Sequence, residues 1–145
     1  MTTTATNRLM DDPEGRVRET VPSGSPEVLL VVDDLPENRD VLARRLRRAG
    51  YAVATAENGA AALRLVAEQE ISLVLLDITM PEMGGGDVLR ALRVRNPELL
   101  VTLMSGFTEA ETRSELEHDG YFGFLQKPFS LDALRAAVDA LLVRR

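Results

Sequence analysis

Short apolar runs alternate with longer segments of helical spacing along most of the chain. Four of the five runs are nearly continuous apolar residues, which favours strands covered on both faces, as in a parallel sheet between two layers of helices. The pattern therefore predicts an α/β fold in which a strand and a helix are repeated five times. The predicted strands are Val28–Val32, Tyr51–Ala56, Leu73–Leu76, Leu99–Met104 and Phe122–Leu125.

The helices are predicted between these strands and after the last one, where apolar residues recur at helical spacing. Gly50 follows the first helix at a position that tolerates a left-handed residue, and Ser130 is placed to cap the last helix. The segment 108–119 has Leu116 as almost its only large apolar residue. We therefore expect the fourth helix to be loosely packed.

Residues 1–26 differ from the rest of the chain in composition. They are rich in Thr, Pro, Gly and acidic residues, have no apolar periodicity and end in PSGSP. This composition is typical of a flexible leader. Because 145 residues suit one ordinary domain, the ordered domain is expected to span residues 27–145.

The overall composition excludes several classes of function. The chain has no Cys, which excludes thiol catalysis, disulfides and thiolate zinc sites and allows a reducing cytoplasm. A net charge of −6 argues against a nucleic-acid partner, because phosphate neutralisation needs a cationic surface. No apolar stretch approaches the length of a membrane span, and the N-terminus lacks a signal sequence. We therefore expect a cytoplasmic protein with neither membrane nor nucleic acid among its partners.

The residues that directly follow the predicted strands form a chemically coherent set. In an open parallel sheet, ligands bind beyond the carboxyl ends of the strands. The first strand is followed by Asp33 and Asp34, the third by Asp77, the fourth by Ser105 and the fifth by Lys127. These five side chains are therefore the candidates for a functional site.

Three carboxylates at one sheet edge repel one another unless a cation lies among them. Mg²⁺ is the usual divalent ion where a phosphate also binds. Lys127 and Ser105 add a compact positive charge and a hydroxyl donor for such a phosphate. Together these groups indicate phosphoryl transfer to a carboxylate, with an acyl phosphate as the covalent product.

The sequence resembles the receiver domains of two-component response regulators over about residues 27–142. The resemblance implies a flavodoxin-like three-layer (βα)5 sandwich with strand order 2-1-3-4-5. The motifs that carry it are VLLVVDDLPENRDVL, LVLLDITMPEMGG, LMSG and FLQKPFS.

Roles for individual residues follow from this resemblance alone. It implies that Asp77 is the phosphoacceptor, and that Asp34 binds Mg²⁺ directly while Asp33 acts mostly through water. It also implies that Asp77 and the backbone carbonyl of Thr79 complete the metal site. Ser105 and Lys127 would hold the phosphoryl group.

The resemblance also implies a switch and a peptide geometry. Ser105 and Phe124 match the switch positions of the family, and the Lys127–Pro128 bond is expected to be cis. Thr79 and Phe107 occupy the positions that flank the path of the attacking water in the family. The sequence segments around Ser105 and Lys127 resemble those of receivers fused to hybrid histidine kinases more than those of transcription-factor receivers.

We therefore expect a signalling phosphoacceptor rather than an enzyme in the ordinary sense. Its phosphodonor would be a histidine kinase or a histidine phosphotransfer protein. A receiver that binds partners without phosphorylation is one alternative, and a phosphatase that uses an aspartyl phosphate is another. The single histidine, His118, is expected to be a surface residue.

Overall fold

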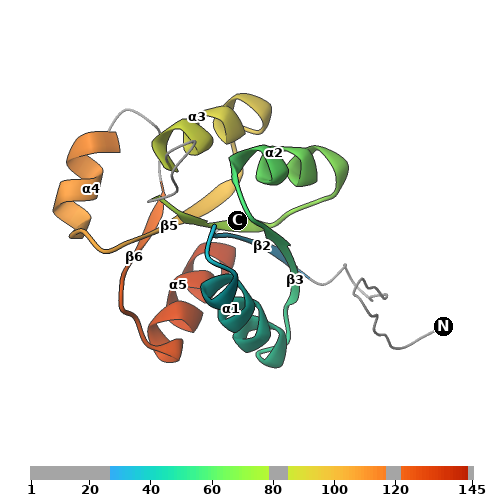
Figure 1. The fold of residues 1–145 in the computed structure, drawn as a ribbon, viewed down its shortest axis with the longest axis vertical. Helices are drawn as coiled ribbons and strands as arrows, with labels where there is room; N and C mark the ends of the chain where they lie inside the picture. The colour runs from blue at the N-terminus through green and yellow to red at the C-terminus, as the bar shows by residue number, and fades with distance from the viewer. Residues whose placement is uncertain (1–26, 79–84, 117–121, 144–145) are drawn as a thin grey trace.

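The computed structural model describes residues 27–78, 85–116 and 122–143, so the expected leader lies outside the described part. Five strands alternate with five helices along this part of the chain (Figure 1). The strands are β2 (Val28–Val32), β3 (Ala52–Ala56), β4 (Leu73–Asp77), β5 (Leu100–Ser105) and β6 (Gly123–Gln126). The helices are α1 (Pro36–Arg48), α2 (Gly59–Glu68), α3 (Gly85–Arg95), α4 (Glu109–Leu116) and α5 (Leu131–Val143).

All strand pairs are parallel, in the order β3-β2-β4-β5-β6. In chain order this is second, first, third, fourth, fifth, which confirms the expected flavodoxin-like topology. The helices cover both faces of the sheet, with α1 and α5 on one side and α2 and α3 on the other (Figure 1). Parallel strands need this cover, because each β-α-β crossover places a helix on a face of the sheet.

Two apolar clusters fill the space between the sheet and its helical layers. One joins alternate strand residues to α2, α3 and Leu116 of α4, while the other joins the remaining strand residues to α1 and α5. In β2, for example, Leu30 belongs to the first cluster and Leu29 and Val31 to the second. This two-residue alternation is the geometry of a strand buried on both faces.

The ends of the helices follow local sequence signals with one exception. Ser130 Oγ accepts the Ala133 amide at 3.0 Å, as predicted, and Asn58 Oδ1 caps α2 through the Ala61 amide at 2.8 Å. Gly50 has the expected left-handed backbone, with φ of 106°. The exception is α1, whose N-cap is Leu35 and makes no side-chain capping bond.

Helix α4 has few buried side chains, as its sequence predicts. Only Thr112 and Leu116 of this helix are buried. The guanidinium of Arg113 lies 4.5 Å above the ring of Phe122 and donates to the Phe122 carbonyl at 3.0 Å. These few contacts join α4 to the start of β6.

Three strands, β4, β5 and β6, end one residue later than the apolar runs predicted. Asp77 ends β4 and Ser105 ends β5, because backbone pairing continues past the last apolar side chain and the Ile78 amide still donates to the Met104 carbonyl at 3.2 Å. Both candidate side chains are therefore carried by hydrogen-bonded strands rather than by loops.

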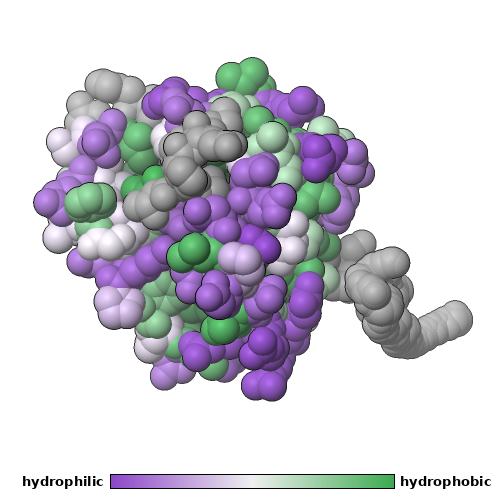
Figure 2. All heavy atoms as spheres, viewed as in Figure 1, coloured by the Kyte–Doolittle hydropathy of each residue, from purple (hydrophilic) through white to green (hydrophobic). Residues whose placement is uncertain are grey.

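The face of the molecule shown in Figure 2 is mostly polar. Hydrophilic side chains cover most of the face in Figure 2, and hydrophobic ones lie scattered between them. Among the described residues, no helix has the length and apolar character required to cross a membrane.

One buried polar group in the core generates a stability prediction. The Thr102 side chain in β5 is fully buried, and its Oγ1 has no hydrogen-bond partner. Because a buried hydroxyl without a partner costs about 1–3 kcal/mol, we expect Thr102→Val to raise the free energy of unfolding by about 1 kcal/mol. Urea denaturation measures this change. Thr55→Val, at an exposed position of the edge strand β3, is the matched control and should leave stability nearly unchanged.

Candidate functional site

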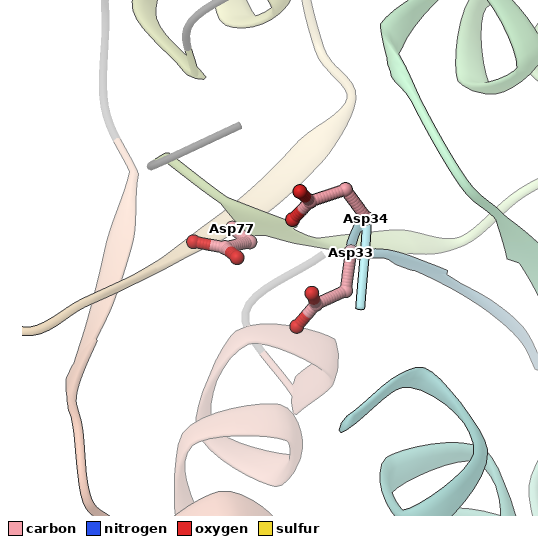
Figure 3. Close-up of side chains that lie close together, drawn as sticks. All are labelled: Asp33, Asp34 and Asp77. Atoms are coloured by element: carbon pink, nitrogen blue, oxygen red, sulfur yellow. The ribbon is translucent and has the colours of Figure 1, made fainter. Parts of the chain in front are cut away.

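Three carboxylates meet at the carboxyl ends of β2 and β4. One oxygen from each of Asp33, Asp34 and Asp77 lies within 4.8 Å of the other two. Figure 3 shows the three side chains grouped beyond the ends of these two neighbouring strands. The structure thus brings together the three acidic residues that the sequence selected.

Strand register explains why Asp33 and Asp77 share a level. Val32 of β2 pairs with Leu76 of β4. The residues that follow them, Asp33 and Asp77, therefore lie at the same height along the sheet. The alternation of side chains places both on the α1 and α5 side of the sheet, in line with Leu75 and the rest of that core cluster. The side chain of Asp34, one residue further along, points in a different direction from that of Asp33 (Figure 3).

Lys127 reaches the acidic cluster from the far edge of the sheet. Its Nζ lies 3.3 Å from Asp77 Oδ2, and its side chain is 29% exposed. Its backbone amide donates to the Ser105 carbonyl at 2.7 Å, which extends the pairing of β5 with β6 by one step. The Lys127–Pro128 peptide bond is cis, as expected.

Ser105 ends β5, the strand that pairs with β4 and lies beside Asp77. Its side chain is buried, and its Oγ accepts the Phe107 amide at 2.9 Å. A hydroxyl that accepts one hydrogen bond still has its own proton to donate. Ser105 therefore retains a donor for an anionic group.

The environment of Asp33 fits a cation. Its residue exposure is 0%, and its Oδ1 accepts the Leu35 amide at 3.0 Å. The other oxygen, Oδ2, is buried without a hydrogen-bond partner. A buried carboxylate oxygen without a donor, beside two further carboxylates, is the type of group that a hard divalent cation satisfies.

The pKa of Asp33 reflects this environment. Burial is the main cause that raises its pKa above the usual range, and the charges of Asp77 and Asp34 raise it further. The hydrogen bond from the Leu35 amide and the charge of Lys127 act in the opposite direction. Asp33 therefore resists ionisation in the absence of a cation.

The remaining candidates have different positions. Phe124 is half-buried and packs against the cluster that contains α3 and Leu116 of α4, whereas Phe107 is 59% exposed. Thr79 and His118 lie outside the described residues.

Sequence reasoning missed one residue beside the acidic cluster. Arg39 lies within the quoted motif VLLVVDDLPENRDVL, and its Nη1 donates to the backbone carbonyl of Asp33 at 2.7 Å. It was not selected because it follows no strand. The only sequence signal for this contact is the position of Arg39 near the start of the predicted helix, six residues after Asp33.

The buried charge of Asp33 generates a pH-dependent prediction. A carboxyl whose pKa is raised on folding destabilises the folded state at pH values where it is ionised, and this cost disappears as the pH falls through the folded pKa. We expect Asp33→Asn to raise the free energy of unfolding of the metal-free protein at pH 7, with a smaller gain at pH 5. Urea denaturation at the two pH values measures this. Asp40→Asn, which removes an exposed carboxylate of α1, should show no such gain.

Comparisons with known sequences find relatives in signalling proteins. Sensor kinase CckA of Brucella abortus is 39% identical over 125 residues, which are 85% of this chain and 13% of the kinase. Transcriptional regulatory protein PrrA of Mycobacterium tuberculosis is 42% identical over 124 residues, which are 83% of this chain and 52% of the regulator. The chain thus spans about half, or much less, of the length of these relatives. Because the relatives include both a sensor kinase and a transcriptional regulator, the expected resemblance to kinase-fused receivers in particular stays a prediction.

Solved structures show the same fold. The chemotaxis protein CheY4 of Vibrio cholerae superposes with a TM-score of 0.77 at 28% identity, over 81% of this chain and 99% of that one. The receiver domain of NtrX from Brucella abortus gives 0.74 at 31% identity, over 81% and 99%. TrrA of Thermotoga maritima, in complex with Mg²⁺-BeF, gives 0.72 at 33% identity, over 80% and 99%.

A family model matches most of this chain. The model described as the response regulator receiver domain matches residues 29–139, which include strands β3 to β6 and all of β2 except Val28. The chain therefore belongs to the response regulator receiver domain family.

Proposed function

We propose that this receiver domain takes a phosphoryl group from a phosphohistidine partner onto Asp77 and thereby changes its binding surface. The observation that carries the proposal is the grouping of three carboxylates with Lys127 Nζ, 3.3 Å from Asp77 Oδ2, at the ends of adjacent strands. In the transfer, an Asp77 carboxylate oxygen attacks phosphorus, the P–N bond of phosphohistidine breaks, and its electron pair returns to the imidazole.

Asp33, Asp34 and Asp77, together with the backbone carbonyl of Thr79, are the groups that would hold Mg²⁺. The buried Asp33 Oδ2 without a partner supports this assignment, as does the complex of the related TrrA with Mg²⁺-BeF. When bound, the ion would neutralise the negative charge shared by the carboxylates and the phosphoryl oxygens.

Lys127 and Ser105 are the groups that would receive the phosphoryl oxygens. Lys127 supplies a compact ammonium that already lies beside Asp77, and it offsets the charge added by phosphorylation. Ser105 supplies a hydroxyl proton from the neighbouring strand, while its Oγ keeps the hydrogen bond from the Phe107 amide. Both groups act by position and charge rather than by forming a covalent bond.

Ser105 and Phe124, the two expected switch positions, would link phosphorylation to the binding surface. A move of Ser105 toward the phosphoryl group would change the space beside Phe124, which packs against the α3 and α4 side of the core. Helix α4 has only two buried side chains, so its displacement breaks few contacts. The face formed by β5, α4 and β6 is therefore the proposed switch surface.

The donor is proposed to be a histidine kinase or a histidine phosphotransfer protein, since the relatives include a sensor kinase and transcriptional regulators. Phosphorylation-independent binding is the second candidate. The complete set of three carboxylates, hydroxyl and lysine favours the phosphoacceptor. A phosphatase is less favoured, because Thr79 stands where such enzymes place a second aspartate.

Labelling with acetyl phosphate tests the proposal. With Mg²⁺ present, we expect intact-mass spectra to show one added phosphoryl group, and peptide mapping to place it on Asp77. Asp77→Asn should abolish the label, because the amide cannot act as the nucleophile. Asp40→Asn, which removes an exposed carboxylate of α1, is the matched control and should be labelled like the parent protein. A label that survives in Asp77→Asn would contradict the assignment.

The switch surface has its own prediction. On addition of Mg²⁺ and beryllofluoride, amide hydrogen exchange should change most between Ser105 and Gln126. The added acceptor atoms would take a hydrogen bond from the Ser105 hydroxyl and so move Ser105 toward Asp77. Strands β2 and β3 should change least and serve as the internal reference. An unchanged pattern in the 105–126 segment, with the ligand shown to be bound, would rule out this switch.

A further inference from the structure

Arg39 closes a small ring of hydrogen bonds around the acidic turn. Its Nη1 donates to the Asp33 carbonyl at 2.7 Å, and its backbone amide donates to the Leu35 carbonyl at 3.0 Å. The Leu35 amide in turn donates to Asp33 Oδ1 at 3.0 Å. The turn that carries Asp33 and Asp34 is therefore fastened to the first turn of α1.

The N-terminus of α1 depends on this ring more than the other described helix starts do. Helices α2 and α5 begin with capping side chains, Asn58 and Ser130. Helix α1 begins with Leu35, which has no polar side chain, followed by Pro36. Helical side chains lean toward the N-terminus of their helix, so Arg39 is well placed to reach back over this turn.

The ring also determines which atoms of Asp33 remain available. The Asp33 amide donates to the Ala56 carbonyl at 3.2 Å, the carbonyl accepts from Arg39, and Oδ1 accepts from Leu35. Only Oδ2 is left without a hydrogen-bond partner. Each of the other polar groups of Asp33 thus fixes the residue so that this oxygen stays in the cluster.

We propose that Arg39 is a positioning residue that holds the Asp33–Leu35 turn against the mutual repulsion of the carboxylates and so sets the affinity of the cluster for a divalent cation. The inference rests on the proposed function in one respect, that the cluster binds such a cation. Arg39 acts through the backbone carbonyl of Asp33 and does not itself contact the cation.

The charge of Arg39 makes the proposal sharply testable. A guanidinium near the cluster repels a cation, so removal of its charge alone would strengthen cation binding. Loss of its positioning role would weaken cation binding, because the turn would open under carboxylate repulsion. The two effects have opposite signs, and the sign of the change identifies the role.

The experiment measures Mg²⁺ binding by isothermal titration calorimetry for the parent protein, Arg39→Gln and Arg39→Lys. We expect the dissociation constant to rise about tenfold in Arg39→Gln, as is typical when an outer partner of a metal ligand is lost. Arg39→Lys keeps the positive charge but lacks the planar guanidinium. Its dissociation constant for Mg²⁺ should therefore rise by a smaller factor. Arg45→Gln removes a positive charge from an exposed position of the same helix, and should leave the dissociation constant unchanged or slightly lower.

Amide exchange of the metal-free variants separates positioning from general stability. The Leu35 amide reports the ring directly, whereas the Leu75 amide in the buried strand β4 reports global opening. We expect exchange at Leu35 to accelerate in Arg39→Gln far more than at Leu75. Equal acceleration at both sites would show a merely structural role and would overturn the proposal.

Each remaining outcome decides one of the two claims. Mg²⁺ binding by Arg39→Gln that is as tight as or tighter than that of the parent would overturn the positioning role. Failure of the parent protein to bind Mg²⁺ would overturn the proposed metal site, and the exchange result would then decide the role of Arg39 alone. If Arg39→Gln does not fold, Arg39→Lys carries both measurements.

Discussion

Repulsion between carboxylates held at one edge of a buried sheet is the constraint on which the rest of the site depends. The register of β2 with β4 puts Asp33 and Asp77 at one level, and burial prevents water from screening them. The apolar strands behind these residues are packed on both faces, so the side chains cannot separate without breaking the core. Each neighbouring group, including Lys127 on the opposite side of Asp77, offsets part of this cost.

The fold separates a rigid side from a side that can move. Asp33, Asp77 and Lys127 lie toward α1 and α5, where Leu134, Val138 and Leu141 of α5 are buried in the core. On the other side, α4 contributes only two buried side chains. A change in charge at the rigid site therefore has its smallest structural cost on the α4 side. Under the proposed function, this asymmetry would let one domain combine a fixed phosphoacceptor site with an adjustable binding surface.

Most of the fold and most of the site were predictable from the sequence, because both follow from strand ends. Apolar runs located all five strands to within about one residue, and the three aspartates and Lys127 beyond their ends proved to be neighbours. Two features were beyond such reasoning. The unpartnered hydroxyl of Thr102 depends on the exact packing of β5 and β6, and the contact of Arg39 with the Asp33 carbonyl depends on a side-chain direction. Neither property is encoded in hydrophobic spacing.

Two cations serve this site through different chemistry. Lys127, the one lysine of the chain, brings a compact ammonium to within 3.3 Å of Asp77 Oδ2. Arg39 instead reaches back along its helix to a backbone carbonyl at 2.7 Å, a contact that suits a long side chain with several directed N–H donors. Every other Lys or Arg position of the chain is arginine, so the single lysine coincides with the position where the proposed transfer favours a compact point charge over a planar fork.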